Sequence, residues 1–148
     1  MEKNFIRVRS AKDIVIFSLL IIAGCVLALI PGADTLNLGG YCLIVIGVAL
    51  ALFLKSSYKD LDAKELFLKK EFLFPKEMKG SIMSALSSTP NSIELSKNGE
   101  SQALKLELFY SKKSGKAYLQ LFEYIPYQYE VCSEIYEYEI SKVNKLLL

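Results

Sequence analysis

The chain has 148 residues, of which 52% are hydrophobic, and its mean hydropathy is +0.29. The formal net charge is only +2, which gives no sign of the extended basic surface that nucleic-acid binding needs. Histidine is absent, which excludes Ser-His and Cys-His nucleophile pairs and histidine metal sites.

Two uncharged apolar runs, residues 14–33 and 35–54, stand near the start of the chain. A bilayer core of roughly 30 Å needs about 20 helical residues, so each run is long enough to cross it. We predict an N-terminal two-helix transmembrane hairpin over 14–54, with spans at 14–33 and 37–54. Two alternatives are a buried helix pair in a soluble protein, and a cleaved signal peptide followed by one anchor.

Basic residues flank these runs, but the loop between them contains none. Lys3, Arg7, Arg9 and Lys12 precede the first run, and further lysines follow the second. Short loops rich in Lys and Arg stay on the cytoplasmic side. We therefore expect residues 1–13 to form a basic cytoplasmic segment, and the chain to be a multi-pass protein of the cell (inner) membrane with both termini cytoplasmic.

Small residues recur at a spacing of four within each run. Gly24 and Ala28 lie in the first run, and Gly47 and Ala51 lie in the second. Small residues at this spacing let membrane helices approach closely, so these four are the predicted helix–helix packing residues. Self-association through the hairpin is a further hypothesis. Since neither run contains an ionisable side chain, the hairpin is typical of an anchor rather than of a transport path.

Residues 55–148 predict a small cytoplasmic α+β domain with a three- to four-stranded antiparallel sheet. The first part of the domain is the harder to interpret. Residues 65–74 fit either a strand pair or the end of a helix, and 76–87 predict a short amphipathic helix. The alternation at Ile93 and Leu95, followed by Asn98-Gly99, predicts a strand that ends in a tight hairpin turn.

The rest of the domain alternates apolar and polar residues with period two. This pattern predicts strands at 104–108 and 117–124, and a short extended piece at 136–140. Val143, Leu146 and Leu147 are assigned to a terminal helical turn. The predicted helix and this terminal segment are the available covers for the apolar face of the sheet.

The remaining chemistry is carried by cysteine and by carboxylates. Cys132 is flanked by Glu130 and Glu134, which disfavour a thiolate if they lie close in the fold. With Glu137 and Glu139, these acids fall within ten residues, and paired acids can run hydrolysis or bind a cation. A solvated acidic edge is the simpler interpretation. We expect no catalytic residue, no cofactor and no metal site.

Tyrosine is concentrated in the same stretch, around Pro126. Tyrosine gives a large rigid surface with a polar tip and is enriched at protein interfaces. The predicted partner-binding residues, which we call the Tyr/Glu segment, are Tyr124, Tyr127, Tyr129, Glu130, Glu134, Tyr136 and Glu137. Acidic residues there favour a basic partner. The alternative is that these tyrosines are half-buried filler of a sheet.

These observations predict a membrane-anchored protein-interaction module without catalytic activity. An immunity or inhibitor protein and an accessory subunit of a membrane complex are two versions of it. The expected partners are the lipid bilayer and a protein, and not nucleic acid. A lipid-headgroup-sensing membrane module is the alternative, followed by an enzyme that uses acidic residues on a membrane substrate.

Overall fold

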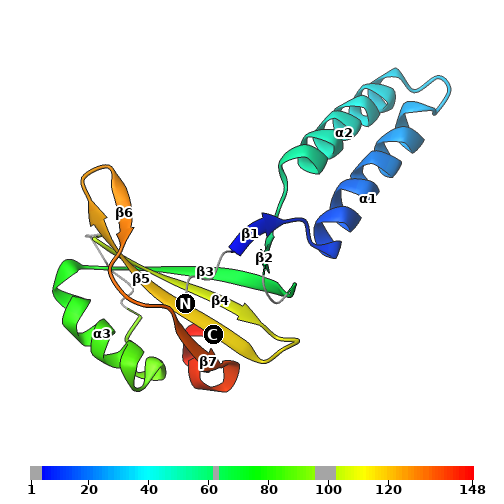
Figure 1. Cartoon of the computed structure of the whole chain (residues 1–148). Helices are drawn as coiled ribbons and strands as arrows, with labels where there is room; N and C mark the ends of the chain where they lie inside the picture. Colours follow the sequence, from blue (N-terminus) through cyan, green and yellow to red (C-terminus); the bar gives the residue numbers. More distant parts are fainter. Residues whose placement is uncertain (1–4, 62–63, 96–102) are drawn as a thin grey trace. The chain divides into compact units, whose positions relative to one another are not determined.

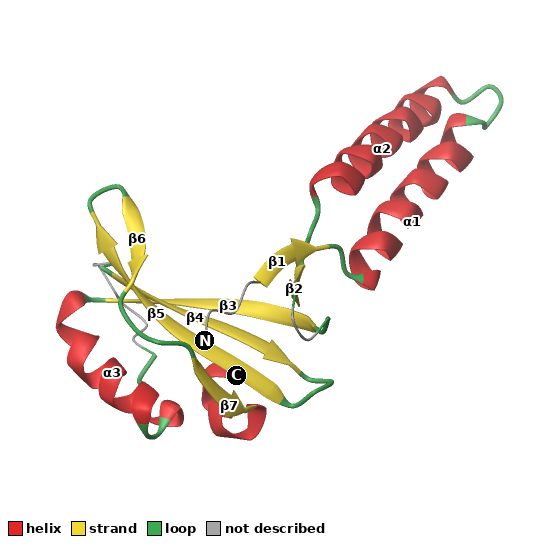
Figure 2. Ribbon diagram, in the orientation of Figure 1, coloured by secondary structure: helices red, strands yellow, loops and turns green. Residues whose placement is uncertain are grey.

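The computed structural model describes residues 5–61, 64–95 and 103–148, and the chain forms two compact units. One unit is a helix pair within Arg7–Ser57. The other joins Phe5 and Ile6 to Tyr58–Leu148 and is built on an antiparallel sheet (Figures 1 and 2). The helix pair is therefore inserted, in the order of the chain, between the first strand of the sheet and the others.

The helix pair consists of α1 (Ala11–Ala28) and α2 (Asp34–Phe53). α1 begins earlier than the predicted span because Ser10 and Asp13 form a capping box at its first turn. It also ends earlier, because the chain reverses before α2 and Gly32 takes a φ of +73° in that turn. Both helices are long and apolar enough to cross a membrane, with a mean hydropathy of 2.2 each.

Hydrogen bonds join Asp13, in the first turn of α1, to Ser56, which follows α2. The Ser56 backbone nitrogen donates to Asp13 Oδ2 at 2.9 Å, and its hydroxyl donates to Oδ1 at 2.6 Å. Ser10 donates its backbone N–H to the same carboxylate at 2.9 Å. Asp13 is only 3% exposed, and a buried charge needs hydrogen-bond partners, which these donors supply. The start of α1 is thereby held to the residues that follow α2.

In the part of the chain that the structure describes, the sheet has seven strands in the order β1-β2-β3-β4-β5-β6, with β7 also paired to β5. The bounds are Phe5–Val8 (β1), Ser57–Asp60 (β2), Leu66–Phe74 (β3), Leu104–Ser111 (β4), Lys116–Ile125 (β5), Gln128–Val131 (β6) and Tyr136–Glu139 (β7). A small antiparallel sheet domain after two apolar helices is confirmed, but the predicted number of strands is wrong. The missed strands are β1, β2 and β6, each of four residues.

In the first part of the domain, the structure decides one open assignment and corrects one predicted strand. Residues 65–74, left open above, contain the single strand β3. The predicted strand at Ile93 and Leu95 is wrong. The short helix η2 (Pro90–Ser92) comes directly before these residues, and residues 93–95 continue from it as irregular chain. Ile93 follows it and is buried in the core. The expected Asn98-Gly99 turn lies outside the described residues.

One face of the sheet carries the main hydrophobic core. Two helical segments supply side chains to the same cluster: α3 (Lys79–Ser87), which follows η1 (Lys76–Met78), and the terminal η3 (Ile140–Val143) with α4 (Asn144–Leu147). Figure 1 shows both on the same side of the sheet. The buried members are Phe74, Ile82, Ala85, Leu86, Ile93, Leu104, Leu106, Leu108, Ala117, Leu119, Leu121, Val143 and Leu146.

The opposite face carries a smaller aromatic cluster. Phe67, Phe109 and Tyr118 are buried there, and Phe5 packs against all three. The Phe5 ring stacks on Phe109 with 4.1 Å between centroids and an interplanar angle of 6°. Phe109 and Tyr118 are directly paired across β4 and β5, so both side chains point to the same face. The first strand of the chain therefore contributes to the interior of the sheet domain.

Candidate functional site

The Tyr/Glu segment is divided between two short strands that pair with β5. β6 pairs with the end of β5, where Tyr124 lies opposite Tyr129. β7 pairs with the start of β5, where Leu119 lies opposite Tyr136. Glu134 is exposed in the connection between the two strands. The predicted residues thus lie along β5 at two separate places rather than in one patch.

The β7 part of the segment serves mainly the fold. Tyr136 packs against the main core, and Glu137 forms an ion pair with Lys116 at 3.0 Å. Tyr138, which was not predicted as a site residue, donates its hydroxyl to the backbone carbonyl of Leu86 in α3. Burial raises the pKa of Tyr138, with a smaller contribution from Tyr136. For this half, the sheet-filler interpretation describes the contacts.

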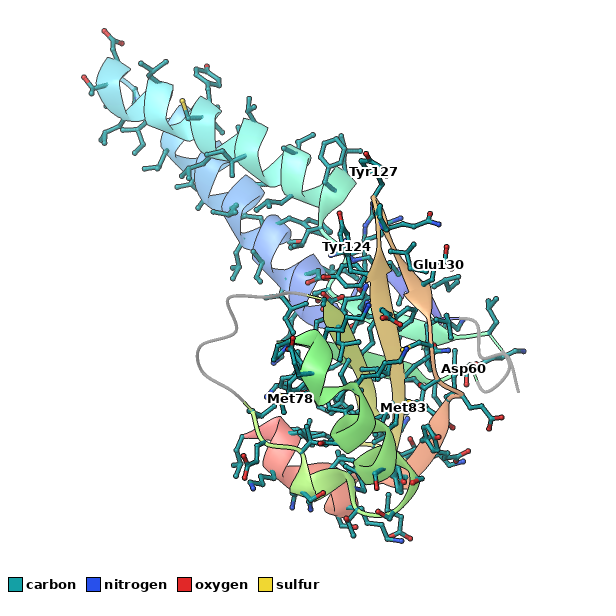
Figure 3. The ribbon with its side chains drawn as sticks, turned by 90° about the vertical axis from the view of Figure 1, so that its left-hand side faces the viewer. Asp60, Met78, Met83, Tyr124, Tyr127 and Glu130 are labelled. Carbon is teal, nitrogen blue, oxygen red and sulfur yellow. The ribbon has the colours of Figure 1, made fainter. Side chains whose placement is uncertain are left out.

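The β6 part forms an exposed aromatic hairpin tip, which we define as Tyr124 to Tyr127. Tyr124 is 50% exposed, and Tyr127 is 97% exposed. Their partner Tyr129 is half-buried, and its ring meets that of Tyr124 edge-on at 5.3 Å. Figure 3 shows Tyr127 at the end of the hairpin and Glu130 farther along β6. Glu130 is exposed and accepts a hydrogen bond from Gln128 at 2.8 Å.

The turn at this tip has an uncommon conformation. Ile125 and Gln128 are paired, so Pro126 and Tyr127 form a two-residue turn. Tyr127 has a φ of +80°, the value that the third residue of a type II turn requires and that glycine usually supplies. A left-handed conformation costs a residue with a Cβ about 1 kcal/mol. The backbone N–H of Tyr127 donates to the Tyr124 hydroxyl at 3.3 Å, which supports the turn.

Two lysines and one glutamate join the base of the hairpin to α3. Lys79 donates to Glu123 at 2.5 Å, and Lys76 lies 3.3 Å from the same carboxylate. The hydrogen bond from Lys79, followed by that from Lys76, lowers the pKa of Glu123. The hydrogen bond to Glu123 raises the pKa of Lys79 in return. The sequence pattern gave no signal for this group, because its members come from separate elements.

Cys132 lies near this group but is not activated by it. Burial raises the pKa of the thiol, and although Lys79 acts in the opposite direction, the net shift is upward. A raised pKa reduces the thiolate fraction that nucleophilic chemistry needs. Its Sγ lies 3.5 Å from the backbone carbonyl oxygen of Leu121. The geometry is that of a structural cysteine.

The face opposite the main core carries an ion-pair ladder that sequence reasoning missed. Glu107 lies 2.8 Å from Lys69 and 2.7 Å from Lys105, and all three side chains are at most 18% exposed. Burial acts to lower the pKa of Lys69, but its hydrogen bonds to Glu107 and Glu71 together raise it. The Lys105 ammonium also lies 4.7 Å from the Tyr129 ring. The ladder ties β3, β4 and β6 together.

The acidic cluster predicted from the sequence does not converge in space on a common ion. Among the residues that the structure describes, no group of three or more His, Cys, Asp or Glu side chains could hold a metal. Glu137 and Glu139 border a polar hollow of about 460 Å³. Its lining also includes Lys116 and Lys142, so both acids and bases border it.

Gly24, Ala28 and Gly47, three of the four predicted helix-packing residues, lie where α1 and α2 approach each other, together with Gly40. A Cβ on Gly24 would stand 2.7 Å from the carbonyl oxygen of Gly40, and one on Gly40 would stand 2.5 Å from the nitrogen of Ala28. A Cβ on Gly47 would meet the Ile21 side chain at 2.6 Å. Ala51 is half-buried. Gly40 was not predicted, because it is not four residues from Gly47. Of the three glycines, it is the one at which an added Cβ would lie closest to the partner helix.

Comparisons of the chain with protein-family models, with curated proteins and with solved structures found no match in any of the three. The architecture defines the class at a coarse level: two apolar helices that could span a membrane, followed by a small antiparallel sheet domain.

Proposed function

We propose that this protein is a membrane-anchored interaction module without catalytic activity, whose helix pair spans the cell membrane and whose sheet domain works at the cytoplasmic face. The observation that carries the anchor is the exposure of apolar side chains around both helices. Only 11% of the residues in each apolar window are buried. Leu19, Ile22 and Val26 on α1 and Val45 and Leu52 on α2 are each 60–68% exposed. Lipid is the solvent that suits such a surface.

The contacts of β1 favour a retained hairpin over a cleaved signal peptide. Cleavage after α1 would remove Phe5, which stacks on Phe109 inside the sheet domain. It would also remove Asp13, which binds Ser56 beyond α2, and Gly24, which packs against Gly40. Each of these contacts joins residues on opposite sides of such a cleavage site.

The same strand supports a hairpin topology with both ends on one side of the membrane. β1 precedes α1, and β2 follows α2, yet both strands belong to one sheet. A chain that leaves a domain and returns to it crosses a bilayer an even number of times. Arg7 and Arg9 before α1, Lys12 in its first turn and Lys55 after α2 are basic residues that favour the cytoplasm for that side.

For a protein partner, we propose an acidic edge at β7 formed by Glu134 and Glu139, of which Glu139 borders the polar hollow. Glu134 and Glu139 are exposed, and the charge of this edge suits a partner with basic residues. Short edge strands such as β7 also offer a place for an added strand.

Photo-crosslinking in intact cells tests this role. A crosslinking amino acid in place of Glu139 should give one discrete adduct in every preparation, because a specific partner binds there. The same probe at Glu77, an exposed acid in η1, serves as the matched control. Equal crosslinking patterns at the two positions would contradict the assigned surface.

A further inference from the structure

The hairpin tip is apolar, aromatic and free of charge. From Tyr124 to Tyr129 the chain reads Tyr-Ile-Pro-Tyr-Gln-Tyr, with no ionisable acid or base other than the tyrosine hydroxyls. Tyr124, Ile125 and Tyr127 are 50%, 43% and 97% exposed. A cluster of this kind on a small domain marks a contact surface.

The backbone of the tip is suited to a poorly hydrated environment. Pro126 has no N–H to leave unpaired, and the N–H of Tyr127 is already bonded to the Tyr124 hydroxyl. The residues on either side, Ile125 and Gln128, pair with each other in the ladder. An unpaired backbone donor is costly at membrane depth, and this turn exposes none at its two central residues.

A tyrosine at the position of positive φ is the second sign of a role in binding. Glycine would adopt the turn without strain, yet the chain places here its most exposed aromatic ring. Strained backbone positions cluster at sites where the strain serves a purpose. A tyrosine has an apolar ring and a polar hydroxyl, which is the chemistry enriched at membrane–water interfaces.

The connectors keep the sheet domain close to the helix ends. Only Leu54, Lys55 and Ser56 separate α2 from β2, and only Arg9 and Ser10 separate β1 from α1. At about 3.5 Å per residue, neither connector can extend beyond roughly 10 Å. If α1 and α2 span a bilayer, the domain therefore stays at its surface, whichever side of the domain faces the lipid.

The charges at the base of the hairpin also suit lipid headgroups. Lys76 and Lys79 both lie against the carboxylate of Glu123, and the Lys76 side chain is 70% exposed. Such a lysine can approach a lipid phosphate while the tip beyond it enters the apolar boundary. A protein surface that receives the same tip would have to supply both an aromatic pocket and an acidic rim.

We infer that the β5–β6 hairpin tip, with Tyr127 at its end, inserts into the headgroup–acyl boundary of the bilayer beside the protein's own anchor. This inference rests on the proposed function, because it needs α1 and α2 in the membrane. It assigns to Tyr124 and Tyr127 a lipid contact in place of the protein contact predicted for them from the sequence. The acidic edge at β7 stays available to a protein partner.

The absence of tryptophan from the chain makes a direct test possible. Tyr127→Trp in the full-length protein, reconstituted into phosphatidylcholine vesicles, places a single fluorophore at the tip. Replacement of the lipid with its acyl-chain-brominated analogue should reduce the emission roughly two-fold or more, with a blue-shifted maximum, as for other interfacial aromatic residues. Ile125→Trp provides a second probe if Tyr127→Trp does not fold.

Two further single-tryptophan variants make the outcomes distinguishable. Lys113→Trp probes the turn at the other end of β5 and should keep its emission in brominated vesicles. Leu19→Trp probes α1 and should be quenched strongly. Quenching at Leu19→Trp without quenching at either tip probe would overturn this inference and leave the anchor intact. Loss of quenching at Leu19→Trp as well would overturn the anchor itself.

Discussion

The ring of Phe5 stacks on the ring of Phe109 with 4.1 Å between centroids, although the helix pair separates the two residues along the chain. The contact commits the residues before α1 to the interior of the domain that follows α2. The helix pair is thus an insertion into the sequence of one folded domain, and not a segment that precedes the domain. The stability of the domain should therefore depend on a residue that looks, in sequence, like part of a basic tail.

Phe5→Ala should lower the free energy of unfolding of the sheet domain by about 2 kcal/mol, less than the roughly 3–5 kcal/mol of a fully buried phenylalanine, because Phe5 is half-buried. Denaturant unfolding in detergent micelles, followed by tyrosine fluorescence, measures the change. The matched control is Ile6→Ala, since Ile6 is the next residue and is 42% exposed. Equal effects of the two substitutions would show that Phe5 does not contribute in the way its contacts indicate.

Gly40→Ala should weaken the contact between α1 and α2, because the new Cβ would stand 2.5 Å from the backbone nitrogen of Ala28. Overpacking of this kind costs about 1–3 kcal/mol. Gly39→Ala is the control, because it adds the same methyl group to the same helix at a position where, among the described residues, no atom beyond the adjacent helix backbone lies within 4 Å. Thermal unfolding of the helix pair in micelles distinguishes them. The prediction fails if Gly39→Ala is as disruptive as Gly40→Ala.

Glu107→Gln should destabilise the sheet domain by about 3 kcal/mol, because Lys69 and Lys105 would lose the carboxylate between them while both stay largely buried. Glu71→Gln removes a carboxylate that is 49% exposed and lies 2.6 Å from the same Lys69. It should cost less than about 1 kcal/mol. The comparison of the two free energies of unfolding at neutral pH is the measurement. A larger loss for Glu71→Gln would mean that the ladder is not the stabilising group.

The Lys79–Glu123 pair should give the domain a pH dependence with a definite sign. Because the pKa of Glu123 is lowered in the fold, its contribution is present above the ordinary pKa of a glutamate and is lost as the pH falls through the lowered value. Because the pKa of Lys79 is raised, its contribution is present below the ordinary pKa of a lysine and is lost as the pH rises through the raised value.

The difference in free energy of unfolding between the unchanged protein and Glu123→Gln should accordingly be constant at neutral pH and shrink at both acidic and strongly alkaline pH. Glu77→Gln, an exposed acid in the neighbouring η1, should show no such profile. A difference that grows as the pH falls would have the wrong sign for this pair.

The elements that were predicted are those whose apolar pattern is local. The two apolar helices are uninterrupted apolar runs, and α3, β4 and β5 repeat an apolar residue at a fixed spacing. β1, β2 and β6 have four residues each, which is too short for a period to show. Phe5–Val8 also contains Arg7, so its charge suggested a tail, and only its pairing partners far along the chain make it a strand.

The residues of the candidate site also fall into those that the sequence could indicate and those that depend on contacts made in the fold. The composition drew attention to Tyr124 and Tyr127, which the fold leaves exposed. It could not distinguish them from Tyr136, which the fold packs against the core, since the distinction depends on which part of β5 each strand joins. Gly40 was missed because the contact face of a helix is set by the partner helix as well as by spacing four along its own sequence.

We propose above all that α1 and α2 cross the membrane as a hairpin and leave the sheet domain in the cytoplasm. In a variant with Cys25, Cys42 and Cys132 changed to alanine, a single cysteine can be placed in the turn by Ala33→Cys or in the domain by Ser141→Cys. A membrane-impermeant maleimide should label the turn cysteine in intact cells and the domain cysteine only after the membrane is opened. Labelling of the domain cysteine in intact cells, or release of the protein by alkaline carbonate, would contradict the account.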